Sequence, residues 1–229
     1  MATALVSAAV SSAARAAPSR ASPPDGAPIV HVVDDDDRGL AALTRLLRAH
    51  GFDARGYTSG AEFLLARGGE GPSCLVLDVG LPGLGGEELQ AALTRAGDAM
   101  PVVFLTGRGD IAMSVRAMKA GAIDFLTKPV RREALFAAIN AAIERARANG
   151  ARELSLRGLN DGHASLTPRE RQVLALVAQG WPNRAIAAEL GVAVRTVKAH
   201  RAQVMHKMHL SCVADLVHAA TRLGLIRRA

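Results

Sequence analysis

One short segment constrains the fold more than any other. It is the apolar run Cys74-Leu75-Val76-Leu77, which ends in Asp78 and is soon followed by Gly80-Leu81-Pro82-Gly83. A run that is apolar at every position is typical of a strand buried on both faces, as in parallel sheets. Ligands of open parallel sheets bind beyond the carboxyl ends of the strands. Asp78 is therefore predicted at a ligand-binding edge, and a solvated loop aspartate is the alternative.

Four further runs have the composition of strands, and helical segments separate them. The expected strands are residues 29–33, 52–57, 74–78, 101–105 and 122–126, and the expected helices are residues 38–50, 58–67, 87–96, 110–120 and 130–148. Such alternation requires a parallel sheet covered by helices on both faces. The predicted fold class is therefore an α/β, flavodoxin-like domain with a five-stranded parallel sheet of order 2-1-3-4-5.

Polar side chains follow four of these strands at the point where each strand ends. Asp34 and Asp35 open an acidic run after the first strand, and Asp78, Thr106 and Lys128 follow the third, fourth and fifth. The first and third strands flank the switch point of this sheet, so their carboxylates should converge. Carboxylate oxygens suit Mg²⁺, and a lysine adds positive charge. The set predicts a pocket where a carboxylate accepts a phosphoryl group. A solvated acidic turn that opens the next helix is the alternative for part of the run.

The net charge of +7 lies almost entirely at the C-terminal end. Residues 29–148 hold 14 basic and 15 acidic side chains, whereas residues 164–229 hold 10 basic and 3 acidic ones. A basic domain beside a near-neutral one indicates a polyanionic partner, of which nucleic acid is the leading candidate.

The C-terminal segment carries the pattern of a helix-turn-helix. Thr167, Pro168 and Glu170 predict a capped helix start, and a second helix over residues 184–190 ends at Gly191. A third helix from about residue 194 to 208 follows a short turn, which is the helix-turn-helix arrangement. This third helix is basic and has no acidic residue, so it is the expected DNA-binding helix; a solvated basic helix is the alternative.

The remaining features bound the organisation of the chain. Two isolated cysteines, Cys74 and Cys212, fit a reducing cytoplasm, and no apolar run approaches the roughly 18 residues of a membrane helix, so no membrane partner is expected. Residues 1–28, rich in Ala and Ser, are predicted to form a disordered extension, and a secretory or transit peptide is the alternative. Turn-prone residues place a linker at 149–164 between domains at 29–148 and 165–229. Whether the last helix of the first domain continues to Leu156 is left open.

Several motifs in residues 29–148 resemble the receiver domain of response regulators. They are Val32-Val33-Asp34-Asp35-Asp36, Leu77-Asp78 with Pro82 four residues on, Leu105-Thr106-Gly107 and Ala122-Ile123-Asp124-Phe125-Leu126-Thr127-Lys128-Pro129. The resemblance implies that Asp78 is phosphorylated from the phosphohistidine of a cognate sensor histidine kinase. It also implies that Asp34, Asp35, Asp78 and the backbone carbonyl of Gly80 bind Mg²⁺, that Lys128 assists, and that Thr106 and Phe125 are switch residues. An ordinary core aromatic is the alternative for Phe125.

The sequence departs from the receiver pattern beside the phosphoacceptor. The family often has a polar residue two positions after the phosphorylated aspartate and Met before the proline, where this chain has Gly80 and Leu81. A backbone carbonyl survives a glycine, so metal binding should too. The lifetime of the phosphoryl group is left open, because the side chain that would touch the attacking water is absent.

The motifs Leu166-Thr167-Pro168-Arg169-Glu170-Arg171-Gln172-Val173-Leu174, Asn183-Arg184-Ala185-Ile186-Ala187 and Arg195-Thr196-Val197-Lys198-Ala199-His200 resemble the LuxR-type DNA-binding domain. With the receiver motifs they resemble a FixJ/NarL-type response regulator. The resemblance implies that base-facing positions are Lys198, Ala199 and Ala202. The side chains expected to hold phosphates are Arg195, Thr196, His200, Arg201 and Lys207. The last helix, over residues 211–225, is expected to pair two DNA-binding domains, and packing against its own domain is the alternative.

The sequence thus predicts a cytoplasmic transcriptional regulator, not an enzyme. Phosphorylation of Asp78 would promote a homodimer, through a surface near the fourth helix and fifth strand, that binds double-stranded promoter DNA, and RNA polymerase is a further candidate partner. One rival is a DNA-binding regulator that ignores phosphate. The other is a phosphatase with Asp78 as nucleophile, which lacks the usual second acid at Gly80. The target promoter, the signal, the kinase and the direction of regulation are not encoded in any feature described above.

Overall fold

The N-terminal domain is built on a five-stranded sheet. The computed structural model of the chain describes residues 27–68, 71–107 and 111–226. The strands are β1 (Ile29–Val33), β2 (Asp53–Tyr57), β3 (Ser73–Asp78), β4 (Val102–Thr106) and β5 (Asp124–Thr127). All neighbours pair in parallel, in the order β2-β1-β3-β4-β5. The predicted fold class and strand order are therefore confirmed.

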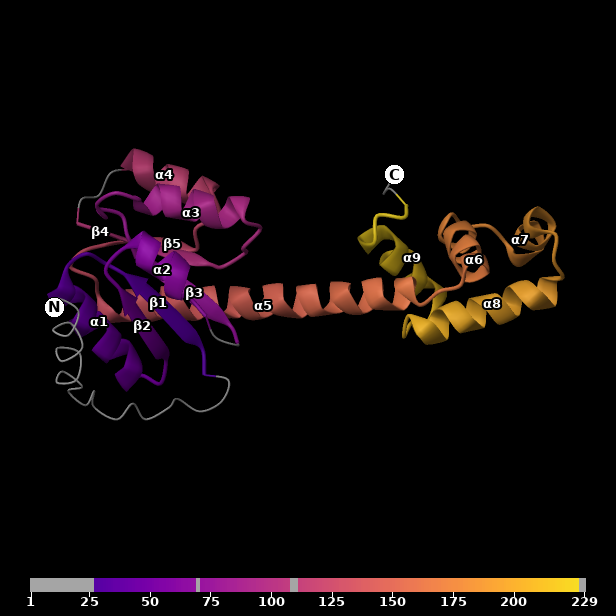
Figure 1. Ribbon diagram of the computed structural model, residues 1–229, viewed down its shortest axis with the longest axis horizontal. Coiled ribbons are helices and arrows are strands. Elements are labelled where there is room, and N and C mark those ends of the chain that lie inside the picture. Colours follow the sequence, from indigo (N-terminus) through magenta and orange to yellow (C-terminus); the bar gives the residue numbers. More distant parts are fainter. Residues whose placement is uncertain (1–26, 69–70, 108–110, 227–229) are drawn as a thin grey trace, which may run out of the picture.

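Helices cover both faces of this sheet (Figure 1). They are α1 (Asp37–Ala49), α2 (Gly60–Ala66), α3 (Gly86–Arg95), α4 (Ile111–Lys119) and α5 (Arg132–Ala164). Side chains of α1 and α5 pack on one face of β1, β3 and β4, and those of α2, α3 and α4 pack on the other. Because alternate residues of each strand face opposite ways, burial on both faces explains why β3 is apolar at successive positions. The predicted extension and the predicted first residue of α4, Asp110, lie outside the described residues.

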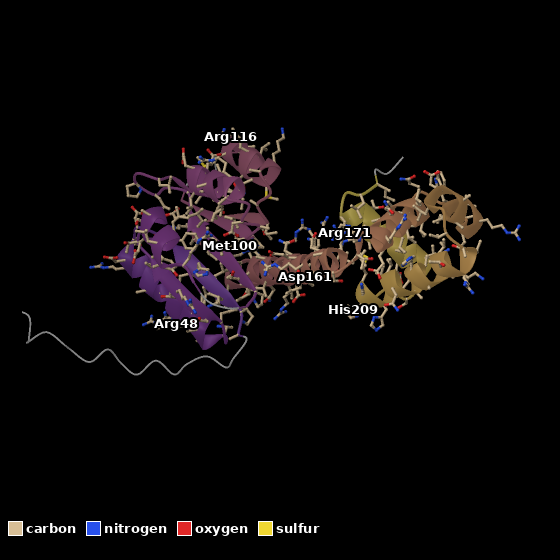
Figure 2. All side chains as sticks on the ribbon, turned by 45° about the vertical axis from the view of Figure 1, so that its right-hand side comes forward. Arg48, Met100, Arg116, Asp161, Arg171 and His209 are labelled. Atoms are coloured by element: carbon tan, nitrogen blue, oxygen red, sulfur yellow. The ribbon has the colours of Figure 1, made fainter. Side chains whose placement is uncertain are left out.

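Helix α5 is much longer than predicted. It was expected to end at about residue 148, yet it continues without a break to Ala164. Gly150 and Gly158 have open space around them and cost only helix propensity, and an i,i+4 ion pair between Glu153 and Arg157 supports this stretch. The segment expected as a turn-rich linker is therefore a solvent-exposed helix between the two domains, marked by Asp161 in Figure 2.

The C-terminal domain is all-helical, as predicted. It comprises α6 (Pro168–Ala178), α7 (Asn183–Leu190), α8 (Val194–Lys207) and α9 (Val213–Arg222). The capping box at the start of α6 is present, because Thr167 Oγ1 accepts from the Glu170 N–H while the Glu170 carboxylate accepts from the Thr167 N–H. Gly191 ends α7 in the left-handed conformation, which turns the chain into α8. In the part of the chain that the structure describes, no helix has both the length and the apolar character needed to cross a membrane.

Candidate functional site

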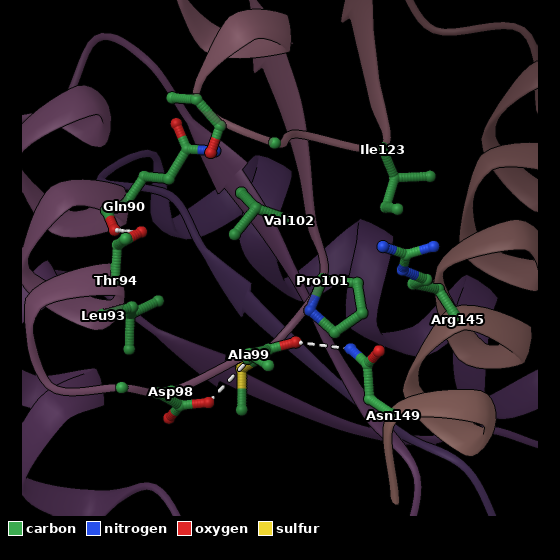
Figure 3. Close-up of a pocket in the computed structure, with 14 residues that line it drawn as sticks. Gln90, Leu93, Thr94, Asp98, Ala99, Pro101, Val102, Ile123, Arg145 and Asn149 are labelled. Atoms are coloured by element: carbon green, nitrogen blue, oxygen red, sulfur yellow. Dashed lines mark hydrogen bonds between the residues drawn. The ribbon is translucent and has the colours of Figure 1, made fainter. Parts of the chain in front are cut away.

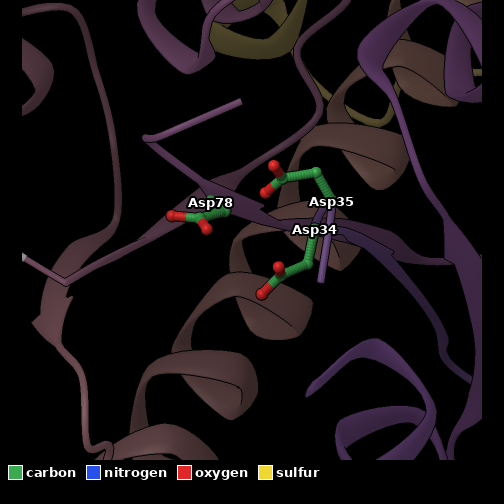
Figure 4. Close-up of side chains that lie close together, drawn as sticks. All are labelled: Asp34, Asp35 and Asp78. Atoms are coloured by element: carbon green, nitrogen blue, oxygen red, sulfur yellow. The ribbon is translucent and has the colours of Figure 1, made fainter. Parts of the chain in front are cut away.

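Three carboxylates converge at the carboxyl ends of β1 and β3 (Figure 4). Asp34 and Asp35 follow β1, and Asp78 is the last residue of β3. Each offers an oxygen within 4.8 Å of the oxygens offered by the other two. Asp34 and Asp78 are buried, whereas Asp35 is exposed, so the group is open to solvent on one side. The predicted convergence of these side chains is what the geometry shows.

Lys128 joins this cluster from the loop after β5, the edge strand of the sheet. Its ammonium donates to Asp34 Oδ2 at 2.7 Å and to Asp78 Oδ2 at 2.8 Å. Burial alone would lower the pKa of Lys128, but its hydrogen bonds to Asp34 and Asp78 and the charges of these carboxylates outweigh burial, so the pKa is raised. Lys128 therefore stays protonated at neutral pH. Three carboxylates against one ammonium still leave an excess of negative charge in the pocket.

The other predicted residues of this pocket are Gly80, Thr106 and Phe125. The Gly80 N–H donates to Asp78 Oδ1 at 3.2 Å, and a Cβ at Gly80 would meet only that oxygen, at 3.9 Å. Thr106 is buried at the end of β4, beside Thr127 of β5 in the sheet register. Phe125 is half-buried against the core, with its ring centroid 6.1 Å from that of Phe104. Apart from Asp78 Oδ1 and its chain neighbours, Gly80 therefore has no described heavy atom within 4 Å of the position that a side-chain Cβ would take.

The acidic run after β1 divides into two roles. Only Asp34 and Asp35 face Asp78. Asp36 instead caps α1, because its carboxylate accepts from the Arg38 N–H, and Asp37 lies in the first turn of that helix. The carboxylate cluster and the acidic helix start therefore involve different members of this run.

Helix α8 presents a basic face on the C-terminal domain. Val197 and Val204 anchor it in the core, and the exposed side chains lie mainly on the opposite side of the helix. Arg195, Lys198, Ala199 and Ala202 are exposed, and Thr196, His200 and Arg201 are partly exposed. The Arg201 guanidinium also donates to Asn183 Oδ1, which ties α8 to the start of α7.

Lys207 departs from its predicted place among the DNA-facing side chains. Its ammonium lies 2.7 Å from the carboxylate of Glu170 and donates to the carbonyl of Ser165 at 3.4 Å. The hydrogen bond from Lys207 is the main reason why the pKa of Glu170 lies below its usual value. Glu170 is one turn into a helix 37 residues away, so no local pattern revealed this pair. Lys207 is therefore paired within the domain, although 29% of its side chain is exposed.

Of the cavities beside the sheet, two lie at its opposite edges. One, of about 760 Å³, lies between α1 and the start of α5 and reaches Asp34 and Lys128. The other, of about 360 Å³, lies at the amino ends of β4 and β5 (Figure 3). Its polar side chains are largely bonded within the fold: Asn149 donates to the Ala99 carbonyl, and Asp98 accepts from the Met100 N–H. Only the first cavity therefore adjoins the carboxylate cluster.

Comparison with known proteins agrees with both domains. The model of the response regulator receiver domain matches residues 30–140, and that of bacterial regulatory proteins of the luxR family matches residues 164–220. Nodulation protein W of Bradyrhizobium diazoefficiens is 44% identical over 197 residues, covering 86% of this chain and 87% of that protein. Transcriptional regulatory protein FixJ of Azorhizobium caulinodans is 40% identical over 202 residues, covering 88% and 95%.

A solved structure is similar over both domains. The response regulator StyR superposes with a TM-score of 0.73 at 45% sequence identity, covering 86% of this chain and 100% of that one. The parallel sheet with its carboxylate cluster, the helical domain with its basic helix and these relatives lead to one conclusion. The chain belongs to the two-component response regulators that join a receiver domain to a LuxR-type DNA-binding domain, which are transcriptional regulators and not enzymes.

Proposed function

We propose that the chain regulates transcription through phosphorylation of Asp78 by a sensor histidine kinase. The observation that carries this proposal is the position of Asp78, with one oxygen on Lys128 and the acidic pair Asp34 and Asp35 within 4.8 Å. A carboxylate held between a cation and other carboxylates, with an open side, is suited to accept a phosphoryl group. Uncompensated negative charge around an aspartate costs stability, so it is not expected around an aspartate with a purely structural role.

The residues of the pocket suggest how the transfer proceeds. An Asp78 oxygen forms a bond to phosphorus while the phosphorus–nitrogen bond of the donor phosphohistidine breaks, and the electron pair of that bond stays on the imidazole. Lys128, already protonated, neutralises an oxygen of the phosphoryl group without moving a proton. The hydroxyl of Thr106 is a candidate donor to a second oxygen, and Phe125 is the candidate aromatic switch beside it.

The carboxylate cluster also fits Mg²⁺. Asp34, Asp35 and Asp78 offer hard oxygen ligands that lie close together, and the carbonyl of Gly80 is a fourth candidate. Mg²⁺ keeps several waters, which the exposed side at Asp35 allows. When bound, the ion would supply positive charge against the phosphoryl oxygens, and it would balance the negative charge that Lys128 leaves uncompensated.

Helix α8 is the proposed DNA-reading element. Arg195 and Lys198 stand on one exposed face, His200 lies partly exposed at its side, and the helix has no acidic residue, which suits the phosphates of double-stranded promoter DNA. The exposed methyl groups of Ala199 and Ala202 can contact a thymine methyl but read no hydrogen-bonding edge. Since Lys207 is engaged by Glu170, it is left out of this surface.

We also propose that phosphorylation favours a homodimer. On α4 the side chains of Ile111, Val115 and Met118 are 80%, 46% and 46% exposed, an apolar face beside β5 that a second copy would cover. Paired DNA-binding domains would then reach two half-sites of a promoter in the cytoplasm, where RNA polymerase is a further candidate partner.

The test is DNA binding at fixed salt, with and without Mg²⁺ and a small phosphodonor. The DNA is selected from a random pool or taken from the upstream region of the gene. Phosphodonor should raise DNA affinity and dimer fraction in the wild type and not in Asp78→Asn. Asp37→Asn is the matched control, because Asp37 belongs to the same acidic run but lies in the first turn of α1. If the wild type and Asp78→Asn respond alike, the receiver serves only for dimerisation and the proposal fails.

A further inference from the structure

The last described hydrogen bond between the connecting helix α5 and the rest of the receiver is made by Asn149. The Asn149 side chain donates to the Ala99 carbonyl at 3.0 Å, which holds α5 against the loop before β4. Beyond it α5 is largely exposed, and Leu154 is 70% exposed. One side of this stretch, with Arg152 and Leu156, still lines a pocket beside the loop before β3. Apolar contact with the DNA-binding domain begins at Leu159, which packs on that domain's core. Gly162 follows, and its lack of a side chain allows the backbone of Met208 to approach.

One side chain of α9 reaches back to this exposed stretch. The Arg222 guanidinium donates through Nη1 to Ser155 Oγ at 2.8 Å and through Nη2 to the Arg152 carbonyl at 3.2 Å. The partners lie 67 and 70 residues apart in sequence. A planar guanidinium that makes two hydrogen bonds to one helix fixes direction as well as distance. Arg222 thus connects the last described helix of the DNA-binding domain to the middle of α5.

This contact shortens the stretch of α5 between its last described hydrogen bond to the receiver, at Asn149, and its first contact with the DNA-binding domain. From Asn149 to Leu159 is ten residues, or about 15 Å of helix at 1.5 Å per residue. With Arg222 in place, the first tie to the DNA-binding domain is at Arg152, only three residues and about 5 Å beyond Asn149. Each domain is then fixed to α5 within a single turn of the other's last tie. A helix supported in this way has little freedom to bend or twist between the two domains.

We infer that Arg222 is a positioning residue that fixes the orientation of the DNA-binding domain on the connecting helix. With its guanidinium on Ser155 and Arg152, α5 beyond Asn149 moves together with the DNA-binding domain. A displacement of α5 at the receiver is then passed on as a rigid motion and is not lost in bending. The basic charge of Arg222 serves this contact and not a DNA phosphate.

The test is a distance measurement between the two domains by double electron–electron resonance. Spin labels are placed on Ala41→Cys and Glu189→Cys, two exposed positions, in a Cys212→Ser background; Cys74 is buried and stays unlabelled. The otherwise unaltered chain should give one narrow distance distribution. Arg222→Ala should lose that single maximum and give a broad distribution. Arg222→Lys, which keeps the charge but can reach one acceptor, should restore it only in part.

Two further variants separate the contact from a general loss of structure. Ser155→Ala should broaden the distribution less than Arg222→Ala, and the double variant should be no broader than Arg222→Ala alone, because both act on one contact. Arg157→Ala is the control, since Arg157 lies on the same stretch of α5 and pairs only with Glu153 among its described contacts. The inference fails if Arg222→Ala keeps the narrow distribution, or if Arg157→Ala broadens it equally.

A second readout rests on the proposed function. If phosphorylation does raise DNA affinity, Arg222→Ala should lose most of that gain while its DNA-binding domain unfolds at the same temperature as in the wild type. The distance measurement needs neither phosphodonor nor DNA. A wild type without any phosphodonor response would therefore contradict the proposed function. The role of the Arg222 contact would then be judged by the distance distributions alone.

Discussion

Each domain contains a lysine that contacts a buried carboxylate, and the two arrangements differ in one respect. In the DNA-binding domain, Lys207 meets Glu170, whose carboxylate also accepts from the Thr167 N–H of the capping box. One ammonium there balances one carboxylate. In the receiver, Lys128 meets both Asp34 and Asp78, and Asp35 lies within reach of the same group. One ammonium there faces three carboxylates.

The difference shows how the same chemical pair serves structure in one place and a reaction in the other. Glu170 has its charge matched and its hydrogen bonds made, so it has nothing left to offer a ligand. Asp78 shares its lysine and keeps excess negative charge around it, on a side that is open to solvent. A cation or an incoming phosphoryl group can complete this second arrangement, whereas the first is already complete. The following predictions test that distinction.

The largest effect is expected from Lys207→Met. It leaves Glu170 buried without a counter-charge, which should lower the free energy of unfolding of the DNA-binding domain by about 4 kcal/mol at pH 8. Trp181, the single tryptophan of the chain, reports this unfolding in urea by its fluorescence. Mg²⁺ should restore nothing. A loss below about 1 kcal/mol, the usual worth of a surface pair, would place Glu170 among solvated groups instead.

The next effect concerns His31, a buried titratable group that forms no ion pair with any described residue. Burial, aided by the charge of Arg55, lowers the pKa of His31 from 6.5 to about 4, and its Nδ1 is hydrogen-bonded to the Tyr57 hydroxyl at 3.0 Å. The unfolded chain then binds a proton at a pH where the folded chain does not. Stability from this group is full above pH 6.5 and is lost as the pH falls toward 4, by about 3 kcal/mol.

The measurement for His31 is urea unfolding of the receiver between pH 7 and pH 4. Carboxylates titrate in the lower part of this range, so the informative quantity is the difference between the wild type and His31→Gln. The variant should lose less stability on acidification over this interval. Parallel curves for the two proteins would show that His31 charges as readily in the fold as in the unfolded chain.

A smaller effect is expected from Lys128→Met. Asp78 and Asp34 lose their shared cation, but water reaches the cluster at Asp35, so the receiver should lose only about 2 kcal/mol without Mg²⁺. Millimolar Mg²⁺ should recover much of this loss, because the ion replaces the missing charge. Circular dichroism in urea with and without Mg²⁺ measures both values. An equal loss in both conditions would remove the distinction between the two lysine sites.

The smallest effect is expected from Arg195→Ala. Arg195 is exposed at the start of α8, so it is free to neutralise one DNA phosphate, whose loss should cost about 1 kcal/mol. The slope of log affinity against log salt should fall by about 0.9. Arg169→Ala, an exposed arginine at the start of α6, is the control. An unchanged slope for Arg195→Ala would move the DNA surface away from α8.

Local sequence was sufficient for most of the fold and for the candidate site. Apolar runs and their spacing predicted all five strands, and the predicted sheet order alone brought Asp34, Asp78 and Lys128 to one edge. The same reasoning missed the length of α5, because Gly150 and Gly158 weaken a helix locally but do not end one whose two ends are held by domains. These turn-prone glycines lower helix propensity, but not enough to end the helix.

The sequence by itself determined the strand pattern, the helix caps and the position of each charged residue along the chain. These follow from side-chain periodicity and from backbone hydrogen bonding within a few residues. Only the tertiary structure decided which lysine meets which carboxylate, and that Arg222 returns to α5. Such contacts join residues 37 to 94 positions apart. The two lysine contacts form because a buried carboxylate needs a partner, and the exposed Arg222 contact forms because the packing of α9 brings it beside α5. No local pattern carries that information.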